Sequence, residues 1–263
     1  MSVREAKHVV KMKSMITEEI ELNEHLQKNN IESLETDLGE YIVQLIGEKP
    51  YHILTPAIHK SKEDVAEIFN KKFGFPLDSS PEQITGFVRR LLRDKFIAAD
   101  IGITGANFLV ADIGGVALTE NEGNGLMTIS FPKTHIVISG IEKIIPSVKD
   151  LDLIWPILAT HGTGQNITAY NTLLTGPKQD QETDGPEEMI VILLDNRRTD
   201  ILEDEQQRRA LTCIRCGACL NGCPVYKSIG GHAYGTTYSG PIGSAITPFL
   251  RGMQEFNHLS FAS

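Results

Sequence analysis

The chain has 263 residues, of which 41% are hydrophobic and 22% are charged. This composition is typical of folded proteins and argues against a disordered chain, and the length favours one large domain or two small ones. The formal net charge of −9 at pH 7 argues against nucleic acid as a partner, because binding to phosphates requires a basic surface.

The apolar runs are short. Even "MIVILL" at 189–194 is far shorter than the ~20 residues that a membrane-spanning helix needs. The N-terminal residues lack the apolar core of an export signal. We therefore expect no membrane span and a cytoplasmic location, where cysteines stay reduced and serve as metal ligands or catalytic groups instead of forming disulfides.

The first two hundred residues alternate between strand-like and helix-like segments. The early part predicts strands over 7–13, 31–36 and 51–55, and helices over 14–30, over 38–47 and from Ser61. The best-defined signal begins at Ser80, where Ser80 is a good N-cap, Pro81 suits the first helical position and Gln83 completes a capping box. The apolar residues that follow are spaced as on the buried face of a helix: Ile84, Phe87, Val88, Leu91 and Leu92.

The middle of the chain is richer in strands. We expect strands over 99–105, 106–112, 115–121, 126–131, 135–140 and 167–176, and a strongly buried strand over 189–196. A helix is predicted over 146–162, in which Pro156 should cause a kink or a break. The alternation implies an α/β fold with a largely parallel sheet, and the hairpin-like central strands suggest that this sheet is mixed.

Near residue 200 the character of the sequence changes. A polar helix is predicted over 200–211, followed by the cysteines and then by a segment rich in Gly, Ser and Thr over 228–249. These changes predict a domain boundary near 198–204. The tail is too short and too rich in glycine for much of an apolar core, so a metal centre is expected to supply the missing cross-link.

All four cysteines lie within eleven residues, at Cys213, Cys216, Cys219 and Cys223. Their C-x2-C-x2-C-x3-C-P spacing matches that of bacterial ferredoxins, and thiolates select iron–sulfur clusters, zinc or copper(I). Structural zinc sites usually separate two C-x2-C pairs by a dozen or more residues, whereas here the pairs merge into one run. We therefore favour a 4Fe–4S centre over zinc, and buried free cysteines would not explain the regular spacing.

The same pattern raises a question about cluster number. In two-cluster ferredoxins the first three cysteines of the run bind one cluster, and the fourth binds the other. By that rule Cys213, Cys216 and Cys219 hold a first cluster and Cys223 belongs to a second. Each cluster needs four thiolates, so either all four cysteines bind a single cluster or further ligands lie outside this chain. We expect the chain to be a fragment that stops before a second cysteine run.

Several longer segments carry a family resemblance. "CPVY" and "GGHAYGTTYSGPIG", together with upstream matches, resemble the lactate utilization protein B family, iron–sulfur proteins of bacterial L-lactate oxidation. The upstream matches cover 13–23, 35–45, 99–125, 131–147 and 174–188. The family pattern has an N-terminal helical region and a second cysteine run that this sequence lacks, which agrees with a fragment.

The resemblance implies a fold and a cellular role. Residues 1–200 are expected to form a lactate-utilization domain, a three-layer α/β unit similar to sugar-phosphate isomerases and CoA transferases. Residues 201–263 are expected to be the N-terminal part of an α-helical ferredoxin-type domain, which holds two 4Fe–4S clusters in the full-length protein. Two companion lactate-utilization proteins are the implied partners, and L-lactate is oxidised to pyruvate with transfer of electrons to an acceptor that the sequence does not identify.

Candidate ligand-binding residues in the α/β part lie in three loops, because open α/β sheets bind ligands at the carboxyl ends of their strands. The loops are 13–19, 102–107 and 119–125. Lys13 or Lys133 is a candidate partner for an anionic ligand, and Glu120 and Glu122 are candidate acid/base residues. A simpler interpretation is that 119–125 is only a turn, since Asn and Gly adopt left-handed conformations readily.

Two functions remain open at this stage. The favoured one is electron transfer through iron–sulfur clusters. The alternative is an isomerase- or CoA-transferase-like enzyme that uses the α/β domain, with the cysteines only structural. His232, in "GGHAYG", is a candidate hydrogen-bond donor to a cluster sulfur, and the plainer interpretation is an ordinary loop residue.

Overall fold

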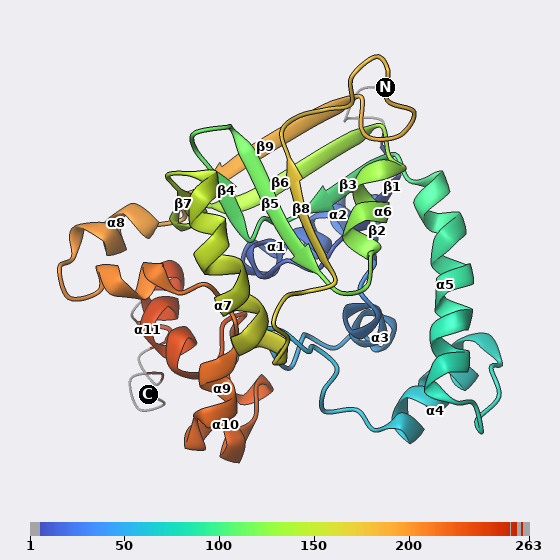
Figure 1. Cartoon of the computed structure of the whole chain (residues 1–263). Coiled ribbons are helices and arrows are strands. Elements are labelled where there is room, and N and C mark those ends of the chain that lie inside the picture. Colours follow the sequence, from blue (N-terminus) through green and yellow to red (C-terminus); the bar gives the residue numbers. More distant parts are fainter. Residues whose placement is uncertain (1–5, 253, 257–258, 260–263) are drawn as a thin grey trace.

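The computed structural model describes residues 6–252, 254–256 and 259 (Figure 1). Its central feature is a five-stranded sheet in which every pair of neighbours is parallel, in the order β2-β1-β3-β6-β9. The strands are β1 (His8–Lys11), β2 (Glu32–Glu35), β3 (Ile101–Thr104), β6 (Thr134–Gly140) and β9 (Glu188–Leu194). Because all strands run the same way, their carboxyl ends meet at one edge of the sheet.

A second, four-stranded sheet has the order β7-β4-β5-β8. Its strands are β4 (Phe108–Val110), β5 (Gly115–Glu120), β7 (Ile144–Ile145) and β8 (Tyr170–Leu174). The β4–β5 and β5–β8 pairs are antiparallel. The expectation of one mixed sheet was therefore wrong: β3 is already paired with β1 and β6, so the hairpin that follows it forms a sheet of its own.

The helices of the α/β part do not all lie on the parallel sheet, since the last of them packs on β4 and β5 of the second sheet. They are α1 (Met15–Glu19), α2 (Leu22–Lys28), α3 (Leu38–Ile46), α4 (Lys62–Phe73), α5 (Pro81–Ala98), α6 (Asn124–Ser130) and α7 (Leu151–Thr163). Both α4 and α5 begin with a capping box, formed by Ser61 with Asp64 and by Ser80 with Gln83. The apolar face of α5 is buried as predicted, and it packs with α3, α4 and Val10 of β1.

Two predictions in the first sixty residues need correction. The helix expected over 14–30 is divided into α1 and α2, because Glu21 adopts a left-handed backbone conformation with a φ of 54°. The strand expected over 51–55 does not form. Nδ1 of His52 lies 3.0 Å from the backbone nitrogen of Leu54 and 3.2 Å from that of Thr55, so the segment turns back on itself locally.

Three predictions in the middle of the chain also differ from the structure. Residues 126–131 belong mainly to helix α6, which packs so closely on β3 that a Cβ atom at Gly102 would lie 1.9 Å from the carbonyl oxygen of Thr128. Helix α7 continues through Pro156 without a break. Strand β9 forms as predicted, but Val191 and Leu193 are 43% and 53% exposed, because β9 is an edge strand of the parallel sheet.

The tail consists of short helices. They are α8 (Arg198–Glu203), α9 (Ala218–Gly222), α10 (Pro224–Ile229), α11 (Gly240–Arg251), and two 3-10 helices over Arg208–Thr212 and His232–Tyr234. The single polar helix expected over 200–211 is thus two separate pieces, α8 and the first 3-10 helix. No helix in the described part of the chain is long and apolar enough to cross a membrane.

The tail has more buried apolar contact than its composition predicted. Leu220, Tyr226 and Tyr234 pack in one buried cluster with Ile53, and a second cluster contains Ile201, Tyr238, Ile246 and Leu250. The contact with segment 51–58 is close, since a Cβ atom at Gly231 would lie 1.7 Å from the carbonyl oxygen of Tyr51. The tail therefore uses the α/β part to complete its core. The boundary near residue 200 stays a prediction from sequence.

Candidate functional site

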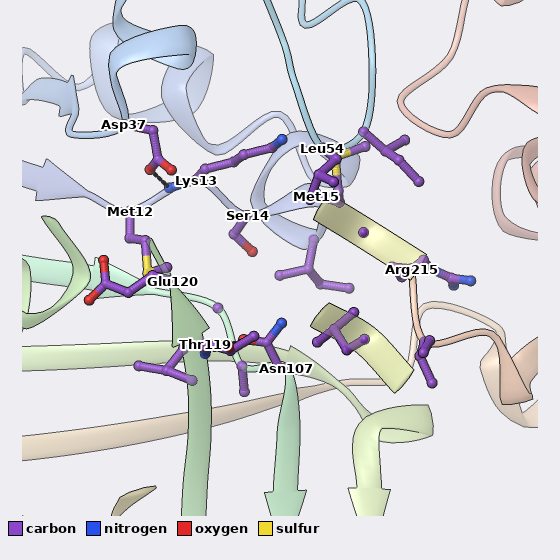
Figure 2. Close-up of a pocket in the computed structure, with 18 of the residues that line it drawn as sticks. Met12, Lys13, Ser14, Met15, Asp37, Leu54, Asn107, Thr119, Glu120 and Arg215 are labelled. Atoms are coloured by element: carbon purple, nitrogen blue, oxygen red, sulfur yellow. Dashed lines mark hydrogen bonds between the residues drawn. The ribbon is translucent and has the colours of Figure 1, made fainter. Parts of the chain in front are cut away.

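A cavity of about 370 Å³ lies beyond the carboxyl ends of β1, β3 and β6, between the two sheets, helix α7 and the tail. All three loops that the sequence predicted contribute to its lining, with residues 13–16, 105–107 and 119–122 (Figure 2). The cavity also touches the cysteine segment through Ile214 and Arg215. The parallel sheet explains the convergence of the first two loops, because it brings the ends of β1 and β3 together.

One end of this cavity is acidic. The side-chain nitrogen of Lys13 is buried and has no hydrogen-bond partner among the described residues, and burial lowers its pKa. The backbone N–H of Lys13 donates to Asp37 at 2.7 Å (Figure 2), and burial raises the pKa of nearby Glu40 to about 8. Several carboxyl groups, including Asp37, Glu40 and Glu122, lie around Lys13. They would repel the carboxylate of a ligand, so this end of the cavity is better suited to the hydrogen-bond donors of a ligand.

The two candidate acid/base residues also lie at this end. The carboxylate of Glu120 accepts the backbone N–H groups of Gly125 at 2.7 Å and Leu126 at 2.9 Å, so it caps the start of α6. Glu122 accepts the N–H of Leu38 at the start of α3. Burial raises the pKa of both carboxyl groups. These contacts give both residues a structural role, and an acid/base role stays a prediction.

Lys133 lies elsewhere. Its side chain is 72% exposed and pairs with Glu187 at 3.3 Å, and it lines a different surface hollow. Its proposed pairing with an anion in the same site as Lys13 is therefore wrong.

His232 does not contact a cysteine in the contacts described. Its Nε2 lies 2.8 Å from the carbonyl oxygen of Lys49, and its ring packs edge-on against Tyr51 and His59. The suggestion that it donates to a cluster sulfur is therefore not supported. In the structure, its contacts attach the "GGHAYG" segment to the α/β domain.

The opposite end of the cavity is cationic. Arg215 is only 10% exposed, its guanidinium lies 5.0 Å from the ring centre of Tyr238, and Nη2 is 3.4 Å from Glu142. Its Nη1 is buried without a hydrogen-bond partner in the described part of the chain. Lys143 lies nearby, with its amine 5.9 Å from the ring centre of Phe108, and burial lowers its pKa to about 8.

A buried ion network supports this end from behind. Arg198 donates to the Glu19 carboxylate at 2.9 and 2.7 Å and to Glu142 at 2.6 Å, and the Tyr238 hydroxyl donates to Glu19 at 2.7 Å. Burial alone would raise the pKa of Glu19, but the Arg198 guanidinium holds it below its usual range. Glu142 is largely committed to Arg198, so it only partly neutralises Arg215.

Cys223 has different neighbours from the other three cysteines in the contacts described. Cys213 and Cys216 lie close enough to Cys219 to add to the rise in its thiol pKa that burial causes, and the backbone N–H of Ile242, at the start of α11, partly offsets this rise. Cys223 instead caps α10, where its sulfur accepts the N–H of Tyr226 at 3.4 Å. The assignment of Cys213, Cys216 and Cys219 to one cluster and of Cys223 to another stays a prediction.

The cysteine loop suits a cluster better than a single zinc ion. Arg215 and Gly217 both have left-handed backbone conformations, with φ of 64° and 79°, so the chain turns between Cys213 and Cys219. The preference for a cluster over zinc rests on the sequence spacing, in which the two C-x2-C pairs merge into one run.

Sequence reasoning missed Arg215 and Lys143 as cavity residues. The only signal for Arg215 was a long cation between two cysteines, among small neighbours. Lys143 follows β6 in "SGIEKIIPS" and had no motif to mark it.

Comparison with known proteins identifies both parts. The family described as "LUD domain" matches residues 3–194, and that described as "4Fe-4S dicluster domain" matches residues 209–258. The chain belongs to the LUD domain family. Its LUD domain precedes a 4Fe–4S segment, so the cofactor and the mixed α/β fold predicted from sequence are confirmed.

Curated relatives agree with the predicted resemblance. Over 99% of its own length, the LUD protein is 46% identical to lactate utilization protein B of Bacillus pumilus. Over the same share of its length, it is 47% identical to lactate utilization protein B of Bacillus subtilis. It covers 55% and 54% of those relatives, so the chain spans about half of their length. A solved structure of a DUF162 family protein from Deinococcus radiodurans aligns with 38% of this chain and 56% of that chain, at 20% identity, with a TM-score of 0.29, which is too low to establish a common fold.

Proposed function

We propose that this chain is the electron-transfer part of an iron–sulfur protein that oxidises L-lactate to pyruvate in the cytoplasm, together with two companion proteins. The observation that carries the proposal is the position of the cysteine loop: Ile214 and Arg215, between two cysteines, form part of the wall of the LUD cavity. A small molecule in that cavity lies next to the cluster segment. The names of the curated relatives supply the substrate class.

The cysteines have distinct parts in this proposal. Cys213, Cys216 and Cys219 bind a first 4Fe–4S cluster, and Cys223 binds a second, whose other ligands come from outside these 263 residues. Oxidation of lactate to pyruvate releases two electrons and two protons, and a 4Fe–4S cluster carries one electron at a time. Two clusters therefore suit a path that passes the electrons singly to an external acceptor.

Reconstitution of the clusters tests the proposal. A chain extended past Ser263 and this shorter chain are loaded with iron and sulfide without oxygen, and iron content and EPR spectra are compared. We expect about twice as many clusters in the longer chain, and reduction of its clusters by L-lactate when the companion proteins are added. A stable full complement of iron on the short chain would contradict the assignment of Cys223, and clusters that lactate never reduces would contradict the electron-transfer role.

A second function is favoured by a separate observation. The cavity gathers Lys13, Glu120 and Glu122 at the carboxyl ends of the strands, as in an isomerase- or CoA-transferase-like enzyme. In that case the cluster is only structural. Undiminished turnover by a Cys213→Ser, Cys216→Ser variant that still folds would favour this alternative, whereas loss of lactate oxidation with retained folding would favour electron transfer.

A further inference from the structure

The cavity of the LUD domain has opposite charge at its two ends. Figure 2 shows Asp37 and Glu120 on one side of the site and Arg215 on the other. The acidic side also contains Glu122, whereas the other side is lined by Lys143 and Arg215 and by one carboxylate, Glu142. Lys13, whose buried amine also has no partner among the described residues, lies on the acidic side, but the carboxyl groups around it make the Arg215 side the more favourable one for a ligand's carboxylate.

Arg215 has the features of a carboxylate-binding group. Its guanidinium is nine-tenths buried, yet Nη1 has no partner among the residues described. A buried donor without a partner costs free energy, and a carboxylate can accept two parallel hydrogen bonds from a guanidinium.

The surroundings leave Arg215 available to a ligand. Among the described residues Arg215 has an ion pair with Glu142 that is long at 3.4 Å, because the other oxygen of that carboxylate accepts from Arg198 at 2.6 Å, and it also interacts with the side chain of Cys213. Lys143 adds a second cation that has no ion-pair partner in the described part of the chain, and its amine faces the Phe108 ring. Apart from Cys213, which interacts with both cations, the cationic end therefore carries more positive charge than Glu142 neutralises.

We propose that Arg215, assisted by Lys143, binds the carboxylate of a short-chain 2-hydroxy or 2-oxo acid, and so holds it between the LUD strands and the first cluster. The opposite, polar side of the cavity, which includes Asn107 and Thr119, then faces the rest of the ligand. This inference rests on the proposed function for the class of ligand. It assigns to Arg215 a substrate-binding role in addition to its place in the cysteine loop.

Direct binding of pyruvate tests the inference without any need for turnover. Full-length protein with its clusters loaded is titrated anaerobically with 13C-labelled pyruvate, and binding is followed by NMR. We expect saturable binding in the parent protein and binding weaker by about 10- to 100-fold in Arg215→Lys, which keeps the charge but loses the planar pair of donors. Lys143→Met is expected to weaken binding as well, and Lys149→Met, a change at an exposed lysine beyond β7, serves as the matched control.

The readouts separate binding from damage to the cluster. The iron content of Arg215→Lys should equal that of the parent protein, because the four cysteines and the positive charge between Cys213 and Cys216 are kept. Pyruvate affinity unaffected by both Arg215→Lys and Lys143→Met, or inorganic phosphate bound as tightly as pyruvate, would overturn the inference. If instead pyruvate binds as expected but lactate never reduces the clusters, the proposed function fails while the binding site stands.

Discussion

Single buried groups in this LUD protein have ionisation behaviour that only their environment explains. His135 is an example, because it lies fully buried in β6, the fourth strand of the parallel sheet, and its Nε2 is 2.8 Å from the Thr104 hydroxyl. Burial disfavours the charged ring and lowers its pKa from 6.5 to about 4. The unfolded chain therefore binds a proton at mildly acidic pH that the folded chain does not bind.

This difference predicts a loss of stability as the pH falls. Above pH 6.5 both states hold a neutral His135, and between pH 6.5 and about 4 only the unfolded state is protonated, so the free energy of unfolding decreases through that window. We expect the parent protein to lose about 2 kcal/mol more than His135→Gln between pH 7 and pH 5. Urea unfolding at both values measures this, and an equal loss in the two proteins would contradict the assigned pKa.

At the scale of elements, close packing decides whether a segment forms a helix or a strand when its local sequence is compatible with both. The segment at 126–131 alternates like a strand, but it forms part of α6 because β3 offers a glycine where the helix backbone approaches. A Cβ atom at Gly102 would lie 1.9 Å from the Thr128 carbonyl oxygen, so the helix and the strand could not keep this distance with any other residue there.

Gly102→Ala is therefore expected to destabilise the protein by about 1–3 kcal/mol, since a backbone carbonyl cannot rotate away as a side chain can. Gly86→Ala in α5 is the matched control. A Cβ atom there meets only the end of the flexible Arg90 side chain, at 3.8 Å, and alanine should stabilise the helix by roughly 0.5–1 kcal/mol. Thermal unfolding of both variants checks the prediction, which fails if Gly102→Ala is neutral.

At the scale of the whole molecule, the tail is attached to the LUD domain through buried charges as well as apolar contacts. Arg198, at the start of α8, joins Glu19 of α1 to Glu142 beyond β6, and the side chains of all three residues are at most 3% exposed. Tyr238 from the tail completes the network through Glu19. The iron–sulfur segment and the cavity are held in one arrangement by these contacts.

Arg198→Met should destabilise the protein by about 3–5 kcal/mol, because it leaves two buried carboxylates without their cation. The neighbouring Arg197→Met is the control, since Arg197 is 55% exposed and its ion pair among the described residues is with the exposed Asp200, so its loss should cost no more than about 1 kcal/mol. Denaturant unfolding measures the two changes. Similar effects of both substitutions would show that the buried network does not attach the tail.

Much of this protein could be predicted where the signal is local. The capping boxes at Ser61 and Ser80 specify the starts of α4 and α5, and the spacing of Cys213, Cys216, Cys219 and Cys223 specifies an iron–sulfur segment. In both cases the residues that determine the structure lie close together in the sequence. The loops at 13–19 and 102–107 were also expected to meet, because they follow neighbouring strands of one parallel sheet, whereas the loop at 119–125 reaches the cavity from the second sheet.

What the sequence could not reveal depends on residues far apart in the chain. Arg198 and Glu19 are separated by 179 positions, and no local pattern pairs them. The exposure of β9 follows from its position at the edge of the sheet, and the cationic end of the cavity exists because the tail folds back over β6. Local sequence determined the helix starts and the cluster-binding motif, whereas the tertiary structure decided the cavity, its charge and its contact with the cysteine loop, since these arise only when distant segments meet.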